Sequence, residues 1–128
     1  MADVFISYAH ADIAFADGRG IQRVLVNLAP ELSYWRDDRI AGGSDWNANI
    51  RTALETAAVV VVIWSKTSWS SYWVRQEAFY AYMKGNLLPL CVDDVVLESP
   101  FNLIQSFRND QAGYENLIRA VRERVRQE

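Results

Sequence analysis

Short runs of apolar residues alternate along the chain with longer segments in which apolar residues recur at helical spacing. The clearest run is VVVVIW at residues 59–64, which is apolar at every position. A strand covered on both faces, as in the middle of a parallel sheet, has this pattern. Further strands are predicted at residues 3–7, 31–35 and 87–92, with a short one within 103–107. Proline cannot donate to a strand ladder, so Pro89 should lie near a strand end or a sheet edge.

The segments between these runs predict helices. Ile21, Val24, Leu25 and Leu28 form one helical stripe, but Gly18 and Gly20 cost about 1 kcal/mol each inside a helix, so the stripe should begin irregularly. The other helices are expected from Ser44 or Asp45 through Ala57, from Ser70 or Ser71 through the segment that carries Trp73 and Glu77, and from Tyr114 onward. Residues 65–71 are expected to be a loop.

The alternation of strand and helix is typical of right-handed βαβ units. It predicts an α/β fold, an open parallel sheet with helices on both faces, in one domain spanning residues 1–128. Ligands of such sheets bind beyond the carboxyl ends of the strands. A ligand site is therefore expected among the segments that follow residues 7, 35, 64 and 92.

Composition narrows the function only a little. The net charge of −3 argues against a nucleic-acid partner, and no apolar run approaches the roughly 20 residues of a membrane span. Cys91 is the single cysteine and lies in an apolar run, so we expect its side chain to pack as a small hydrophobic residue and not to act as a nucleophile. Without a cysteine pair or a signal peptide, the expected compartment is the cytoplasm.

Several common kinds of site are excluded by their motifs. GxxxxGK[ST] is absent, and GRGIQR at residues 18–23 lacks the third glycine of a dinucleotide fingerprint and lies far beyond the strand. A phospho-acceptor domain would have acids after the first and third strands, where this chain has SYAH and SKTS. His10 is the only histidine, so a serine hydrolase site or a metal site has too few candidate residues.

Glu77 is the acid that these exclusions leave unexplained. It stands in SSYWVRQEAFYAYMK at residues 70–84, and the helix provides no basic neighbour three or four positions away. It lies too far into the helix to be a capping-box acid. Trp73 precedes it by one helical turn, so both side chains could face the same crevice. The alternative is a partly exposed glutamate beside a core tryptophan.

Three separated motifs, in order, resemble the Toll/interleukin receptor (TIR) domain family. They are DVFISYAHAD at the start, WRDDRIAGGSDW, and VVVVIWSKTSWSSYWVRQE, and together they lie within residues 2–92. Ser70, Trp73 and Glu77 fit the S-x-x-W-x-x-x-E pattern of that family. The opening motif and the chain length are similar to those of prokaryotic members. The resemblance implies a flavodoxin-like parallel sheet of about five strands.

The resemblance also implies a site. Many members with this glutamate cleave the nicotinamide–ribose bond of NAD⁺, which implies that Glu77 is the catalytic residue and that Trp73 lines its pocket. Its implied substrate-binding residues on or after the first strand are Phe5, Ser7 and Tyr8; those in the loop of residues 36–46 are Asp38, Arg39, Gly43 and Trp46. Many relatives carry an aspartate where this chain has Arg36.

We therefore expect an NAD⁺ glycohydrolase or cyclase that releases nicotinamide and ADP-ribose or a cyclic ADP-ribose, acting in prokaryotic antiviral defence. NAD⁺ would be the substrate, with no separate cofactor and no metal. The expected partners are further TIR domains, bound through the loop at 36–46, and a sensor domain or protein outside this chain. The alternative is a non-catalytic TIR–TIR interaction module or a virulence adaptor, for which Glu77 would be dispensable.

Overall fold

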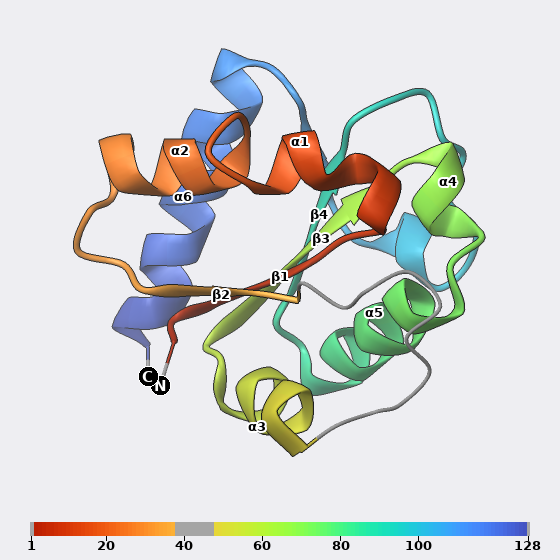
Figure 1. Ribbon diagram of the computed structural model, residues 1–128, viewed down its shortest axis with the longest axis horizontal. Coiled ribbons are helices and arrows are strands. Elements are labelled where there is room, and N and C mark those ends of the chain that lie inside the picture. Colours follow the sequence, from red (N-terminus) through yellow and green to blue (C-terminus); the bar gives the residue numbers. More distant parts are fainter. Residues whose placement is uncertain (1, 38–47, 128) are drawn as a thin grey trace.

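The computed structural model describes residues 2–37 and 48–127, and in these the chain forms one parallel β-sheet with helices on both faces (Figure 1). The sheet has five strands in the order β2-β1-β3-β4-β5, and every neighbouring pair is parallel. This is the flavodoxin-like order, in which the direction of winding reverses between β1 and β3. The predicted fold class is confirmed.

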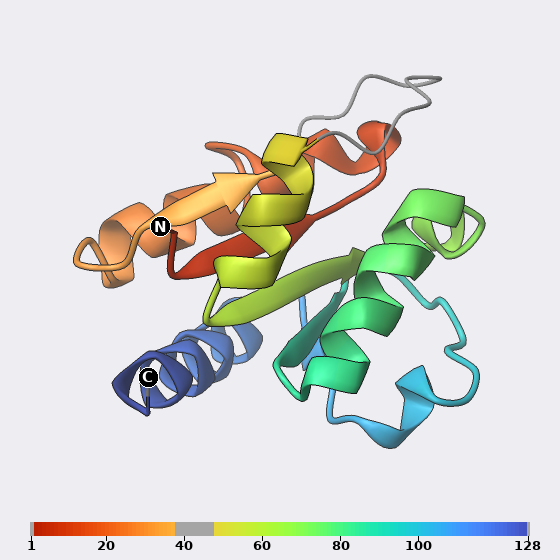
Figure 2. The same ribbon diagram turned by 90° about the horizontal axis from the view of Figure 1, so that it is seen from below.

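The strands are β1 (Val4–Ser7), β2 (Tyr34–Arg36), β3 (Val59–Trp64), β4 (Leu87–Cys91) and β5 (Phe107–Arg108). The helices are η1 (His10–Asp12), α1 (Ile13–Ala16), α2 (Ile21–Leu28), α3 (Ala48–Thr56), α4 (Lys66–Trp69), α5 (Tyr72–Lys84), η2 (Phe101–Leu103) and α6 (Gln111–Arg126). Helices α1, α2 and α6 cover one face of the sheet, and α3 and α5 cover the other (Figures 1 and 2).

The core consists of two clusters, one on each face of the sheet. Alternate residues of β1 and β3 enter opposite clusters: Val4 and Ile6 pack toward α2 and α6, whereas Phe5 packs toward α3 and α5. All six residues of β3 are buried, as its unbroken apolar run predicts. Because β1 and β3 lie side by side in the centre, the carboxyl end of β1 is enclosed by neighbours on both sides and on both faces.

The predicted irregular start of the second helical segment is confirmed, and Gly20 explains it. The segment divides into α1 and α2, which are joined through Gly18 and Gly20. A Cβ on Gly20 would lie 2.1 Å from the backbone oxygen of Phe15, whereas a Cβ on Gly18 would meet nothing within 4 Å. The close approach of the backbone at Gly20 therefore requires glycine.

Three local predictions need correction. The second strand begins at Tyr34, not at residue 31, and the last strand is Phe107–Arg108, not 103–107. Residues 65–71 are not all loop, because Ser65 caps the short helix α4. The hydroxyl of Ser65 accepts from the backbone N–H of Ser68, and the Ser68 hydroxyl accepts from the backbone N–H of Ser65. This reciprocal capping box has Ser68 at the position where a glutamate or glutamine is usual.

Pro89 lies in the middle of β4, which is flanked by β3 and β5, so the prediction of an edge position is also wrong. The N–H of Val92 donates to β3, and alternation along the strand directs even-numbered N–H groups of β4 to that side. Position 89 therefore faces β5, which pairs only with Leu90 and Cys91. No carbonyl of β5 is paired at position 89, so the backbone N–H that proline lacks is not needed for the sheet there.

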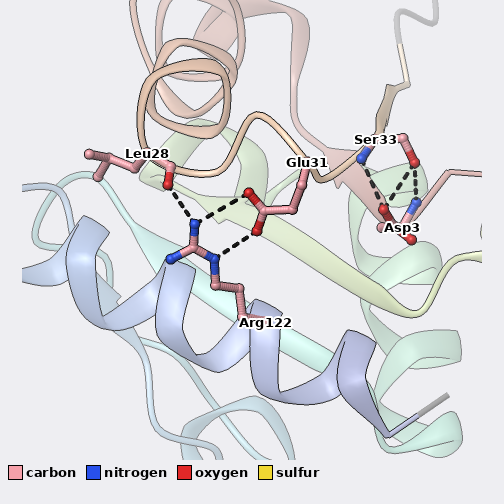
Figure 3. A network of polar contacts seen from close by, with 5 residues as sticks. All are labelled: Asp3, Leu28, Glu31, Ser33 and Arg122. Atoms are coloured by element: carbon pink, nitrogen blue, oxygen red, sulfur yellow. Dashed lines mark hydrogen bonds and ion pairs between the residues drawn. The ribbon is translucent and has the colours of Figure 1, made fainter.

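Polar contacts hold the amino-terminal end of the sheet to its surroundings (Figure 3). The Arg122 guanidinium of α6 donates to both carboxylate oxygens of Glu31, at 2.8 and 3.3 Å, and to the backbone oxygen of Leu28 at 2.7 Å. Asp3 and Ser33 exchange backbone-to-side-chain hydrogen bonds just before β1 and β2. These contacts fix the turn from α2 into β2 at the end of the sheet opposite the carboxyl ends of the strands.

Candidate functional site

A buried hydrogen bond joins the end of β1 to the middle of α5. The Ser7 hydroxyl donates to Oε1 of Glu77 at 2.6 Å, across seventy positions of sequence. Ser7 is fully buried and Glu77 is 1% exposed. The length is typical of a hydroxyl bonded to an ionised carboxylate, in which the charge strengthens the bond. The alternative considered from the sequence, a partly exposed glutamate, is therefore wrong, because Glu77 is buried.

Helix α5 positions this carboxylate through its capping and its small residues. The Ser71 hydroxyl accepts from the backbone N–H of Val74 and begins the helix, as predicted, and Gly85 ends it in the left-handed conformation that glycine favours. Ala78 and Ala81 are completely buried against the sheet. Because these side chains are small, the helix axis lies close enough to the sheet for a glutamate to reach β1.

Trp73 lies one turn before Glu77 on α5 and is half-buried. Its ring meets the ring of Tyr72 edge to face, with the centroids 5.1 Å apart. It also lines a hollow on the outer side of α5, together with Tyr72, Gln76, Phe79, Tyr80 and Met83. Of the sequence-predicted residues, the structure brings Ser7 and Glu77 into direct contact beyond the carboxyl end of β1, and Trp73 lies one helical turn away.

Phe5 and Tyr8 are buried in the two core clusters, one on each face of the sheet. Phe5 is fully buried in the core beneath α3 and α5, stacked on Trp35 of β2 with the ring centroids 5.2 Å apart. It offers no surface to a ligand in this conformation. Tyr8 packs in the cluster on the opposite face of the sheet, with α1, α2 and α6. Asp38, Arg39, Gly43 and Trp46 lie outside the described residues.

A second buried polar pair, which the sequence reasoning missed, lies at the switch point between β1 and β3. The Ser65 hydroxyl donates to Oδ2 of Asp12 at 2.5 Å. Burial raises the pKa of the Asp12 carboxyl; the Ser65 bond opposes this rise, and the charge of Asp93 adds to it. The pair ties the loop after β1 to the cap of α4. The signal in the sequence was a serine directly after the fully apolar strand.

Other titratable groups give little support for additional chemistry. Burial raises the pKa of the Cys91 thiol, a hydrogen bond with Ser106 opposes the rise and Asp93 adds to it, so a thiolate nucleophile is disfavoured. Within residues 2–37 and 48–127, no three His, Cys, Asp or Glu side chains are grouped so that they could hold a metal ion. In the same part of the chain, no helix has the length and apolarity needed to cross a membrane.

Comparisons with known proteins identify the family and the fold. A family model described as "TIR domain" matches residues 4–118. No match was found among curated protein sequences. Among solved structures, the TIR domain of the Toll-related receptor TRR-2 from Hydra magnipapillata is similar, with a TM-score of 0.72 and 16% identity over 95% of this chain and 99% of that one.

Two further structures share the fold. A TIR-STING receptor from C. gigas, solved with 2′,3′-cGAMP, has a TM-score of 0.69 and 20% identity over 94% of this chain, which spans only 39% of the receptor chain. The TIR domains of the activated Roq1 resistosome, which recognises the effector XopQ, have a TM-score of 0.55 and 16% identity over 98% of this chain and 81% of that one. At these identities the likeness concerns the fold.

Proposed function

The chain belongs to the TIR domain family, and we propose that it is an enzyme that cleaves NAD⁺ between nicotinamide and ribose. The observation that carries this proposal is the buried bond from Ser7 to Glu77 at the carboxyl end of β1, with the half-buried Trp73 one turn away. These residues contribute to the first-strand and S-x-x-W-x-x-x-E motifs. A buried carboxylate is costly to the fold, so its retention here favours a chemical role over a structural one.

The proposed reaction breaks the bond between the nicotinamide ring nitrogen and the anomeric carbon of the ribose. The electron pair of that bond leaves with nicotinamide, which departs as a neutral molecule, and the ribose becomes oxocarbenium-like with spread positive charge. The Glu77 carboxylate stabilises this charge, and its effect is strong because the surroundings are apolar. Ser7 holds the carboxylate in place. Trp73 offers an aromatic surface on which a flat base can stack.

The second step determines the product. Water can add to the anomeric carbon and lose a proton, which gives ADP-ribose. Alternatively, a nucleophilic atom of the bound ADP-ribosyl group adds to the same carbon and loses its proton, which gives a cyclic ADP-ribose. Both routes need only the one carboxylate and no metal. Since Glu77 is 1% exposed, substrate binding must first open access to it.

Incubation of the protein at high concentration with NAD⁺ tests the proposal directly, with free nicotinamide as the readout. Glu77→Gln should lower the rate more than tenfold, which corresponds to over about 1.4 kcal/mol of barrier. The amide keeps the shape of the side chain and an acceptor for Ser7. Glu123→Gln on the exposed face of α6 is the matched control and should leave the rate unchanged.

Wild-type protein that releases no nicotinamide at any concentration would favour the alternative, a non-catalytic interaction module. Residual activity above a tenth of wild type in folded Glu77→Gln would instead show that another residue carries the chemistry. Thermal melts of both variants establish that the comparison concerns folded protein. Chromatography of the products then separates ADP-ribose from cyclic ADP-ribose.

We assign the activity to prokaryotic antiviral defence, on the strength of the similarity of the opening motif to prokaryotic members. The TIR domains of the Roq1 resistosome work within an assembly, and the TIR part of the C. gigas receptor is a minor part of its chain. These cases support homotypic association and a separate sensor for this protein as well. Bacteria that express the wild-type protein should resist phage infection better than bacteria that express Glu77→Gln.

A further inference from the structure

Helix α5 is apolar on two opposite faces. One face carries Val74, Glu77, Ala78 and Ala81 into the core beneath the sheet. The other carries large side chains that remain exposed: Tyr72 is 64% exposed, Phe79 50%, Tyr80 38% and Met83 68%. A surface helix normally presents charged and polar residues to solvent. The pattern of α5 is that of a helix covered on both sides.

The outer face of α5 is here defined as Tyr72, Gln76, Phe79, Tyr80 and Met83. Hollows adjoin it on two sides. One is lined by residues of this face together with Trp73, and the other lies between the helix and the segment Ser99–Phe101. Protruding side chains and hollows therefore occur on one patch. A surface with both features can meet a copy of itself about a two-fold axis, so that the projections of each copy enter the hollows of the other.

The charge of this region favours a copy of the chain over other partners. Arg75 is the single charged residue that lines the two hollows, and its guanidinium lies 5.3 Å from the centre of the Trp69 ring of the same chain. Nucleic acids and anionic membranes are recognised by clusters of lysine and arginine, which this face lacks. When two identical faces meet, Arg75 is the one residue lining these hollows that can bring like charges together, and its guanidinium lies over Trp69 of its own chain.

The exposed area is sufficient for a weak dimer. With about 200 Å² for each large side chain, the three aromatic residues and Met83 expose roughly 400 Å² of apolar surface. A standard interface buries about 800 Å² on each partner. Gln76, Trp73 and the rim at Ser99–Phe101 surround the apolar centre and can supply much of the remainder.

We propose that the outer face of α5 is a two-fold interface between two copies of this chain. Glu77 points from the opposite side of the same helix, so the Ser7–Glu77 bond lies outside this contact, whereas Trp73 lies at its edge. The contact also differs from the loop at residues 36–46, through which TIR association was expected from the sequence. The inference does not depend on NAD⁺ cleavage, because association is measured without substrate.

Sedimentation velocity from about 1 to 500 μM tests the interface. The wild-type mass should rise from 14.6 kDa toward that of a dimer across this range. Phe79→Glu should raise the dissociation constant more than tenfold, since it places two like charges near the axis. Val26→Glu is the matched control, because Val26 is 53% exposed on α2 at the other face of the sheet, and it should behave as wild type.

A mixing experiment tests the two-fold geometry. Phe79→Glu and Phe79→Lys should each stay monomeric alone and form a heterodimer when mixed, because opposite charges then meet. Met83→Glu, at a 68% exposed position, gives a second variant if Phe79→Glu does not fold. Circular dichroism and thermal melts establish folding in each case.

Other outcomes overturn the proposal. They are a wild-type monomer throughout the range, equal loss of association in Val26→Glu, undiminished association in both folded α5 variants, or no recovery on mixing. Binding of the wild type to phosphatidylcholine vesicles that Phe79→Glu abolishes, with no dimer in solution, would assign the face to a lipid surface instead.

Discussion

Substitution of Ser7 by alanine tests whether the hydroxyl positions and stabilises the Glu77 carboxylate. Ser7→Ala removes the 2.6 Å bond and leaves the carboxylate buried. A hydrogen bond to a charged group contributes about 1.5–3 kcal/mol. If this contribution is fully present in the transition state, its loss lowers kcat/KM by about 10- to 150-fold, at about 1.4 kcal/mol for each factor of ten.

Nicotinamide release gives the rate, and thermal melts give the folded fraction to which each rate is referred. A merely structural role would lower the folded fraction and leave the rate per folded molecule unchanged. Ser33→Ala removes an exposed serine at the opposite end of the sheet and is the control. Ser7→Thr keeps a hydroxyl and should recover part of the rate.

A double-mutant cycle with Glu77→Gln separates an effect through the carboxylate from a general effect on the fold. If Ser7 acts through Glu77, Ser7→Ala should have little further effect once the glutamate is an amide. Equal losses in both backgrounds would contradict this coupling. A rate per folded molecule within twofold of wild type would show that the Ser7 hydroxyl does not position the carboxylate for catalysis.

Further predictions concern the core and the second polar pair. Burial raises the pKa of Asp12 in the folded state, so the contribution of this group to stability is greatest at low pH and declines as pH rises from about 3.8 through the folded pKa. Asp12→Asn should therefore raise Tm more at pH 7 than at pH 4. An equal change at both values would contradict this. Gly20→Ala should destabilise by at least about 1–3 kcal/mol in urea unfolding, since its Cβ would collide with the backbone of α1, whereas Gly18→Ala should cost nothing. Phe5→Ala should lower stability by about 3–5 kcal/mol, and Trp73→Ala should slow nicotinamide release with a smaller fall in Tm. A larger fall in Tm for Trp73→Ala than for Phe5→Ala would show that Trp73 mainly packs in the core.

The strands were predictable where burial alone determined the pattern. VVVVIW at residues 59–64 became β3 with the same bounds, because a strand covered on both faces is typically a near-continuous apolar run. The position of Pro89 was not predictable, since it depends on the shortness of β5 at that level of the sheet. The periodicity of one segment contains no information about the length of its neighbour.

The candidate site could be predicted in part. The serine-capped α5 and the single acid at position 77 were visible in the sequence. The partner Ser7 entered only through the family resemblance, because nothing local relates positions seventy residues apart. The bond between Asp12 and Ser65 was missed for the same reason. Contacts across the sheet depend on strand order, and strand order is not contained in hydrophobic spacing.

The thirteen residues of helix α5 have three roles, and these roles account for its unusual composition. Its inward face needs small side chains, because only a close approach of the helix to the sheet brings Glu77 within hydrogen-bonding distance of Ser7. Between the two faces, the half-buried Trp73 lies one helical turn before the glutamate. Its outer face carries the apolar side chains through which we propose that a second copy binds. Little room is left for the charged residues that usually occupy a surface helix, and so Glu77 stands alone among alanines and aromatic rings. The same helix would thus carry both the chemistry and the assembly, on surfaces that can be altered one at a time.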